Sequence, residues 1–260
     1  MTGRLAGAEG ASGHDAPRAA LRKLDDAQTS AFDTDYVEGG RWSSVKACVE
    51  RDFPAGDFRF LDVGGGNGRF ADRLLREYPG STGTVLDNSE VLLARNTASA
   101  RKSLVCDSVE NLGRVDGRFD LISVHWLLHH LVGESYRQTR RNQHAALESL
   151  RSLLTPRGRI SMFENMYQGW VLESLPGRLI YQATSTRAIA TVARRMGANT
   201  AGVGVCFLSR AQWLTTLRDC GFEVVRYTEP DHWTWPLRPA WRVFLHLREI
   251  RVGHLWLRAA

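Results

Sequence analysis

Short apolar runs alternate with amphipathic segments along the chain from about residue 42 onward. The pattern predicts strands at 58–63, 82–87, 103–107, 119–126, 159–164 and 223–228, and helices at 42–49, 69–78 and around 146–154. Buried strands that alternate with helices are typical of a parallel sheet covered on both faces. We therefore expect an α/β fold, a Rossmann-like seven-stranded, mostly parallel sheet with helices on both faces.

The hydrophobic pattern weakens between residues 165 and 207, where small, aromatic and basic residues replace regular periodicity. Long connections inside compact domains are usually functional, so we expect a helical insertion after the fifth strand that covers the substrate. Beyond it, Ser209 is a predicted helix N-cap and Gly221 a predicted helix stop. The segment 239–252 is predicted to be helical, and 253–259 is the predicted last strand.

The length of 260 residues suits one domain, here 26–260, after a disordered tail at 1–25 that is rich in Gly, Ala and charge. No apolar run approaches the roughly 20 residues that span a bilayer, so we expect a cytoplasmic protein without stable membrane insertion. The formal charge of +6 comes from arginines spread along the whole chain, which favours a solvated surface over a nucleic-acid partner. The four cysteines lack metal-binding spacing, so no metal is expected.

A glycine-rich segment, DVGGGNG, follows the strand at 58–63 and precedes a predicted helix. A dinucleotide fingerprint needs G-x-G-x-x-G, and its third glycine would fall on Arg69. The bare backbone of Gly64, Gly66 and Gly68 instead suits close approach to a ligand without a pyrophosphate. Asp62 would be buried, so it should accept hydrogen bonds from backbone amides or from a ligand amino group. Asn67 suits turn chemistry as well as ligand contact.

The order of motifs over residues 58–228 resembles that of class I methyltransferases, which use S-adenosylmethionine. The resemblance rests on Asp62–Gly68, on Asp87 and Asp107-Ser108 at the ends of the second and third strands, and on Gly221-Phe222 before the sixth. It implies a glycine loop under the methionine part, Asp87 on the ribose hydroxyls and Asp107 on the adenine amino group. The cofactor-binding set so implied comprises Asp62, Gly64, Gly66, Asn67, Gly68, Asp87, Asn88, Asp107, Ser108 and His125.

Asp87 is also supported by its chemistry, because a strand-ending carboxylate offers two acceptor oxygens to the two donors of a cis-diol. A competing interpretation is that Asp87-Asn88-Ser89 only caps the next helix. The same alternative applies to Asp107-Ser108, since Asp and Ser are both good N-cap residues.

Three histidines, His125, His129 and His130, lie at and just beyond the end of the fourth strand, the sheet edge where open α/β folds bind ligands. Methyl transfer from a sulfonium is a direct displacement, so alignment is essential and a base is optional. We expect His129, on the first turn of a helix above His125, to face the substrate as a candidate catalytic residue, and His130 to pack or cap. Glu164, at the end of the fifth strand, is a second candidate catalytic residue. It would bind the acceptor, or act as a base if burial raises its pKa. The alternative is that it only caps the chain from Asn165 onward.

The segment Asp35–Gly40 resembles an aromatic Gly-Gly segment of phosphobase N-methyltransferases, in which a tyrosine and a histidine close over the amine. The resemblance would make Tyr36 and His129 the corresponding catalytic pair. Tyr36 is equally well explained as a lid contact to the cofactor.

The leading hypothesis is methylation of a small molecule, in particular a specialised metabolite. Nucleic-acid or protein methylation is a second hypothesis. The sequence argues against it, because it contains no Asn-Pro-Pro-Tyr segment, no Pro-Cys nucleophile and no basic block. A third is that the cofactor is retained while the pocket catalyses a cyclisation or rearrangement. The basic C-terminal segment permits weak attachment to an anionic membrane, but its narrow polar edge favours a covering helix. Acceptor identity, methylation at oxygen, nitrogen or carbon, and assembly as a homo-oligomer stay open.

Overall fold

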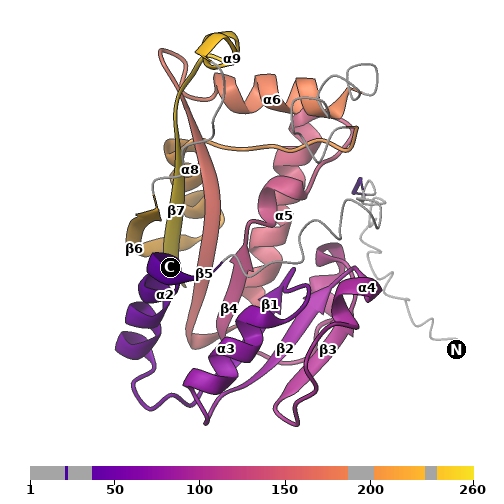
Figure 1. Cartoon of the computed structure of the whole chain (residues 1–260), viewed down its shortest axis with the longest axis vertical. Coiled ribbons are helices and arrows are strands. Elements are labelled where there is room, and N and C mark those ends of the chain that lie inside the picture. Colours follow the sequence, from indigo (N-terminus) through magenta and orange to yellow (C-terminus); the bar gives the residue numbers. More distant parts are fainter. Residues whose placement is uncertain (1–20, 23–36, 187–201, 232–238) are drawn as a thin grey trace, which may run out of the picture.

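The protein is built around one seven-stranded sheet with the strand order β3-β2-β1-β4-β5-β7-β6 (Figure 1). The computed structural model describes residues 21–22, 37–186, 202–231 and 239–260. β7 runs antiparallel between β5 and β6, and the other neighbouring strands are parallel. The strands are β1 Arg59–Val63, β2 Thr82–Asp87, β3 Lys102–Cys106, β4 Phe119–His125, β5 Leu154–Gly169, β6 Phe222–Asp231 and β7 Leu247–Ala259. The predicted Rossmann-like, mostly parallel sheet is confirmed.

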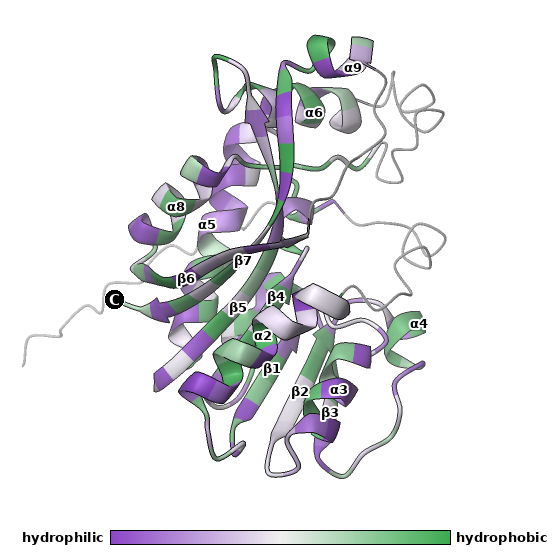
Figure 2. Cartoon of the chain, turned by 60° about the vertical axis from the view of Figure 1, so that its left-hand side comes forward, coloured by the Kyte–Doolittle hydropathy of each residue, from purple (hydrophilic) through white to green (hydrophobic). Residues whose placement is uncertain are grey.

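Helices cover both faces of this sheet. Those described are α2 Gly39–Asp52, α3 Arg69–Glu77, α4 Glu90–Leu93, α5 Tyr136–Ser152, α6 Leu175–Ser185, α8 Arg210–Asp219 and α9 Pro239–Phe244, with short 3-10 turns η1 Val109–Arg114 and η2 Leu128–His130. Leu147 of α5 and Trp213 of α8 belong to the core on one face, whereas Val45 of α2 and Leu74 of α3 belong to the core on the other. Figure 2 shows the hydrophobic residues concentrated along the strands between these layers.

The predicted start and stop of α8 are both present. The Ser209 hydroxyl accepts the Gln212 backbone N–H at 3.2 Å, and the Gln212 side chain accepts the Ser209 N–H at 3.0 Å, which forms a capping box. Gly221 follows the helix with a φ of +74°, a left-handed conformation that glycine adopts without steric cost.

The predicted helix at 239–252 is wrong in its second half. α9 ends at Phe244, His246 has a left-handed φ of +52°, and β7 begins at Leu247. Residues 247–252 pair with 165–169 of β5, which is itself much longer than the predicted strand at 159–164. The ladder of backbone hydrogen bonds to β5 outweighs the helical periodicity of these residues, because local propensity is a weak preference.

Two further regions bear on the site. After β5 the chain forms α6, then lies outside the described residues between 187 and 201, and returns at 202–208 beside β5 through a bridge between Met166 and Leu208. Tyr36 also lies outside the described residues. Within the described part of the chain, no helix has the length and apolar character needed to cross a membrane.

Candidate functional site

The glycine loop connects β1 to α3 at the carboxyl edge of the sheet. Gly64, Gly66 and Gly68 have φ values of +71°, +50° and +73°, which residues with a Cβ rarely adopt. The N–H groups of Gly64 and Gly65 both donate to the Leu86 carbonyl, at 2.7 and 3.3 Å. The loop is therefore a backbone-lined turn fixed to the end of β2.

Asp62 supports the loop from within the sheet. Its side chain is buried, and the Ser123 hydroxyl lies 2.6 Å from its Oδ1. A Cβ at Gly65 would lie 2.5 Å from Asp62 Oδ2, so a residue other than glycine at that position would displace the carboxylate. Asn67 Oδ1 accepts the Arg69 N–H at 3.1 Å, which is the turn chemistry expected of it.

Asp87, at the end of β2, is in direct contact with the glycine loop. Its Oδ2 accepts the Gly66 N–H at 2.9 Å, and its Oδ1 accepts the Ser89 N–H at 2.8 Å. Burial raises the pKa of this carboxyl group, and the backbone N–H donors oppose that shift. Because a carboxylate has about four lone-pair sites, both oxygens can still accept a further hydrogen bond. The neighbouring Asn88 is exposed.

Asp107 and Ser108, after β3, make mainly local contacts. Asp107 Oδ1 accepts the Ser108 N–H at 2.7 Å and the Asn111 amide at 2.6 Å. The Ser108 hydroxyl caps η1 by accepting the Glu110 N–H at 3.5 Å. The Asp107 N–H donates to the Asp87 carbonyl at 3.1 Å, so the ends of β2 and β3 are joined beside the loop. Contact between Asp107 and adenine stays a prediction.

Asn96 is a loop-supporting residue that sequence reasoning missed. Its Nδ2 donates to the Gly66 carbonyl at 2.8 Å and to the Leu93 carbonyl at 3.1 Å. A Cβ at Gly68 would collide with Asn96 Oδ1. Nothing in the local sequence marks Asn96, because the carbonyl that it binds is 30 positions away.

The most buried polar pair of the site joins η2 to β5. Glu164 Oε2 lies 2.7 Å from His129 Nδ1, and Glu164 Oε1 accepts the Leu128 N–H at 2.9 Å. Glu164 is fully buried and His129 is 5% exposed. Burial raises the pKa of Glu164 to about 8 and lowers the pKa of His129 to about 3. Both shifts favour uncharged groups, so near neutral pH the pair holds a carboxylic acid against a neutral imidazole.

The surroundings of His129 hold it in one orientation. Its ring lies 4.7 Å from that of Phe207 and 4.1 Å from that of His130, and its carbonyl accepts the Cys206 N–H at 2.9 Å. The Gln143 side chain of α5 binds the carbonyls of both Leu128 and Cys206. His129 thus lies in a 3-10 turn, clamped between α5 and the chain around 206, rather than on the first turn of a longer helix.

His125 belongs to a different network from His129. Its Nε2 lies 2.9 Å from the Ser161 hydroxyl, which lies 3.1 Å from His254 Nε2, and His254 Nδ1 lies 2.7 Å from the Ser44 hydroxyl of α2. The His125 ring packs against Phe70 of α3 at 4.7 Å, so its side chain faces the α2 and α3 layer. Burial lowers the pKa of His125 well below its usual value and that of His254 to about 3. Any contact of His125 with the cofactor would therefore use its backbone.

Trp126, the residue after β4, is held in a strained conformation with a φ of +51°. Its indole N–H donates to Asn165 Oδ1 at 3.1 Å, and its ring stacks on Phe163 at 5.0 Å. The Arg41 guanidinium of α2 lies 4.9 Å from the centre of the same ring. These contacts fix an aromatic wall at the carboxyl edge of β4, beside the site.

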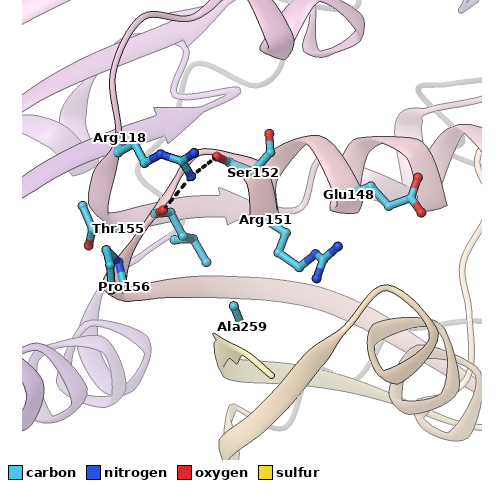
Figure 3. Close-up of a pocket in the computed structure, with 8 residues that line it drawn as sticks. Arg118, Glu148, Arg151, Ser152, Thr155, Pro156 and Ala259 are labelled. Carbon is cyan, nitrogen blue, oxygen red and sulfur yellow. Dashed lines mark hydrogen bonds between the residues drawn. The ribbon is translucent and has the colours of Figure 1, made fainter.

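A hollow of about 380 Å³ lies elsewhere on the molecule (Figure 3). It is lined by residues at the amino end of β5 and the last turn of α5, including Arg118, Arg151 and Pro156. Parallel strands begin at this edge and end at the edge that carries the glycine loop, so this hollow is not a candidate cofactor site. Among the described residues, no group of three or more His, Cys, Asp or Glu side chains is placed to hold a metal ion.

Comparisons with known proteins bear on the domain and on the fold. Residues 61–160 match a family model described as a methyltransferase domain. The [4+2]-cyclase SpnF is similar with a TM-score of 0.56 and 17% identity, and the alignment covers 85% of both chains. A putative sarcosine dimethylglycine methyltransferase from Galdieria sulphuraria is similar with a TM-score of 0.52 and 13% identity, over 84% of both chains. No curated protein matches the sequence.

Some similar structures are longer than this chain. Human N-acetylserotonin methyltransferase, crystallised with S-adenosylmethionine, has a TM-score of 0.51 and 15% identity, and the alignment covers 85% of this chain and 53% of that one. The chain likewise spans 56% of CalO1, a methyltransferase in calicheamicin biosynthesis. The match over 61–160 identifies a methyltransferase domain in the core of the sheet, and the similar structures show that the chain shares their fold.

Proposed function

We propose that this enzyme transfers a methyl group from S-adenosylmethionine to a small-molecule acceptor. The observation that carries the proposal is the hydrogen bond between the Gly66 N–H and Asp87 Oδ2, 2.9 Å long, at the carboxyl edge of the sheet. It places a carboxylate able to accept a ribose diol directly beside a loop whose backbone is bare.

The residues present fit this cofactor. A Cβ at Gly66 would lie 3.3 Å from Leu92 and 3.8 Å from Asp87 Oδ2, so a side chain there would fill the space beside Asp87. A Cβ at Gly64 would lie 3.1 Å from the Leu127 side chain. Gly64–Gly68 and Asp62 would hold the methionine part, Asp87 with Asn88 the ribose, and Asp107 with Ser108 the adenine. When bound, the cofactor supplies an electrophilic methyl group on a sulfonium sulfur.

The His129–Glu164 pair is the candidate for proton handling. When Glu164 carries a proton it donates to His129 Nδ1, and the remaining imidazole proton is then on Nε2, which cannot act as a base. Once the pair loses one proton, Glu164 accepts from Nδ1–H and the lone pair on Nε2 becomes free. His129 would therefore remove a proton from the acceptor only as the pH approaches the Glu164 pKa of about 8.

The acceptor space is proposed to lie between Trp126, η2 and the segment 165–207 within a single domain at 26–260. Support comes from Phe207, which packs on the His129 ring, and from Arg41 of α2, whose guanidinium lies 4.9 Å from the centre of the Trp126 ring. NcsB1, an O-methyltransferase from neocarzinostatin biosynthesis crystallised with S-adenosylmethionine and a naphthoic acid, has a TM-score of 0.50 and 15% identity. A cytoplasmic enzyme that modifies a specialised metabolite is consistent with these features.

A test of the cofactor proposal is calorimetry with S-adenosylmethionine on the wild type and on Asp87→Ala. The loss of two or more charge-assisted hydrogen bonds is expected to weaken binding by about 100-fold or more. Ser103→Ala, on neighbouring β3, is a matched control that should bind normally. Equal affinity of Asp87→Ala and the wild type would overturn the assignment.

One other function has a specific observation in its favour. The similarity to a [4+2]-cyclase extends over 85% of both chains, so the same fold is also known in an enzyme named for cyclisation. Formation of S-adenosylhomocysteine during turnover of an acceptor distinguishes the two: its accumulation supports methyl transfer, and product formation without it supports the cyclase alternative.

A further inference from the structure

Strands β5 and β7 extend beyond the rest of the sheet. β4 ends at His125, opposite Phe163, but β5 continues to Gly169 and stays paired with β7 down to Leu247. Because β5 runs parallel to β4, this two-stranded arm projects past the carboxyl edge, on the side of the candidate site. Figure 1 shows α9 at the far end of the arm, with α6 beside it.

The end of the arm is a fixed turn. The Trp170 N–H donates to the His246 carbonyl at 3.3 Å, and the His246 ring nitrogen Nε2 accepts the N–H groups of Val171 at 2.9 Å and Leu172 at 3.3 Å. His246 itself has a left-handed backbone. The backbone N–H groups of residues 170–172 are thus all bound to His246, and the apolar side chains of these residues face the solvent.

Exposed apolar side chains are concentrated at this one place. Among the described residues, seven large hydrophobic side chains are exposed, and five of them belong to this turn and to α9. We name these five the apolar tip: Trp170, Val171, Leu172, Val243 and Phe244, which are 60%, 84%, 60%, 74% and 66% exposed. A cluster of this kind on a projecting arm indicates an interaction surface.

The charge around the apolar tip indicates the partner. The described residues beside the tip include Arg242, Arg248 and Trp241 together with Glu173 and Glu249, and the Glu249 carboxylate lies 4.0 Å from the Arg248 guanidinium. Arg242 and Arg248 are exposed, and the Arg242 guanidinium binds the Arg248 carbonyl, so both lie beside the tip. Tryptophan is enriched at the boundary between lipid headgroups and acyl chains, and arginine near the surface is attracted to anionic lipid.

We propose that the apolar tip inserts into the surface of an anionic membrane, with Arg242 and Arg248 at headgroup level. The protein would bind the membrane peripherally. Its candidate site would then face the lipid, so that an apolar acceptor could enter the site from the membrane. This proposal goes beyond methyl transfer and does not depend on it, because membrane attachment can be measured without any acceptor.

The test is flotation of the full chain with vesicles of phosphatidylcholine and phosphatidylglycerol, compared with vesicles of phosphatidylcholine alone. The wild type is expected to float with the anionic vesicles, and less so at high salt because the arginine contribution is screened. The double variant Val171→Asp, Phe244→Asp is expected to bind at least about tenfold more weakly. Leu104→Asp, at an apolar residue of β3 that is 45% exposed and lies away from the tip, is the control and should bind like the wild type.

Three results would overturn the proposal. They are no flotation of the wild type with anionic vesicles, equal flotation of the double variant, or a wild-type dimer in light scattering that the double variant converts to a monomer. The last result would show that a second copy covers the tip. Thermal unfolding of the double variant checks that it is folded, and Arg242→Glu, which leaves the apolar residues in place, should by itself weaken binding to the anionic vesicles.

Discussion

Glu164 on β5 and His129 on η2 are joined by a contact of 2.7 Å in a site where Glu164 is fully buried. The two residues are 35 positions apart in sequence, and the end of β5 brings them together. The second carboxylate oxygen of Glu164 accepts the Leu128 N–H. The same side chain therefore fixes the position of η2 and influences which nitrogen of the His129 imidazole carries the proton. Several expected properties of the protein depend on this pair and on the glycine loop.

Replacement of Glu164 by Gln tests proton handling. The glutamine amide can still pair with Leu128 and donate to His129 Nδ1, but it cannot release a proton, so Nε2 would keep its hydrogen. If the acceptor needs a base, the methyl-transfer rate should fall by about 100-fold or more. The rise of the wild-type rate with pH toward about 8 should disappear in the variant.

The measurement is the pH profile of kcat and of kcat/KM for both proteins. His144→Asn, at a partly exposed residue of α5, serves as a control whose profile should match that of the wild type. A Glu164→Gln profile that still rises toward pH 8 would assign the ionisation to another group and leave the pair with a purely structural role.

The glycine loop should not tolerate a Cβ at position 68. Gly68 has a φ of +73°, and a Cβ there would collide with Asn96 Oδ1. Gly68→Ala is expected to lower the free energy of unfolding by about 1–3 kcal/mol and to weaken binding of S-adenosylmethionine. Urea unfolding and calorimetry measure the two effects. Gly113→Ala, where a Cβ meets open space and the backbone is ordinary, should change neither quantity appreciably.

Asn96 is expected to be a positioning residue for the cofactor loop. Asn96→Ala removes the donor to the Gly66 carbonyl, and a typical loss of about 1 kcal/mol would weaken cofactor binding by about fivefold. The matched control is Asn142→Ala on α5, which loses its contact with the Leu131 carbonyl far from the loop. Equal cofactor affinities for the two variants would contradict a specific role of Asn96.

The buried histidines should make the protein sensitive to acid. Burial lowers the folded-state pKa of His254 to about 3, below the unfolded value near 6.5, so the folded state favours the neutral ring. The stability that depends on this neutral ring is complete above pH 6.5 and is lost as the pH falls from there toward 3, by at most about 1.4 kcal/mol per pH unit. His125, whose pKa is lowered in the same direction, adds to the effect.

Urea unfolding at pH 7 and at pH 5 measures this loss of stability. His254→Asn removes one titrating group, so the stability difference between the two pH values should be smaller than in the wild type. An unchanged difference would show that other groups dominate the acid sensitivity.

Much of the candidate site could be predicted from the sequence because its signals are local. The apolar runs fix strand positions within a few residues, and the spacing of Gly64, Gly66 and Gly68 reflects the backbone conformation of one short turn. Strand-ending carboxylates such as Asp87 meet the loop because parallel strands bring their carboxyl ends to a common edge. The loop and Asp87 are therefore adjacent in the structure, as their order in the sequence indicates.

Other features were decided only by the tertiary structure. Residues 247–252 have helical periodicity, yet pairing with β5 makes them a strand. The contacts of Glu164 with His129, of His254 with Ser161 and of Asn96 with Gly66 all join residues at least 30 positions apart. Such contacts arise when whole elements pack, and no local pattern of residues encodes which partners will meet. The sequence by itself thus determined the strands and the glycine loop, whereas packing decided the pairing of Glu164 with His129, the buried histidine network and the projecting arm.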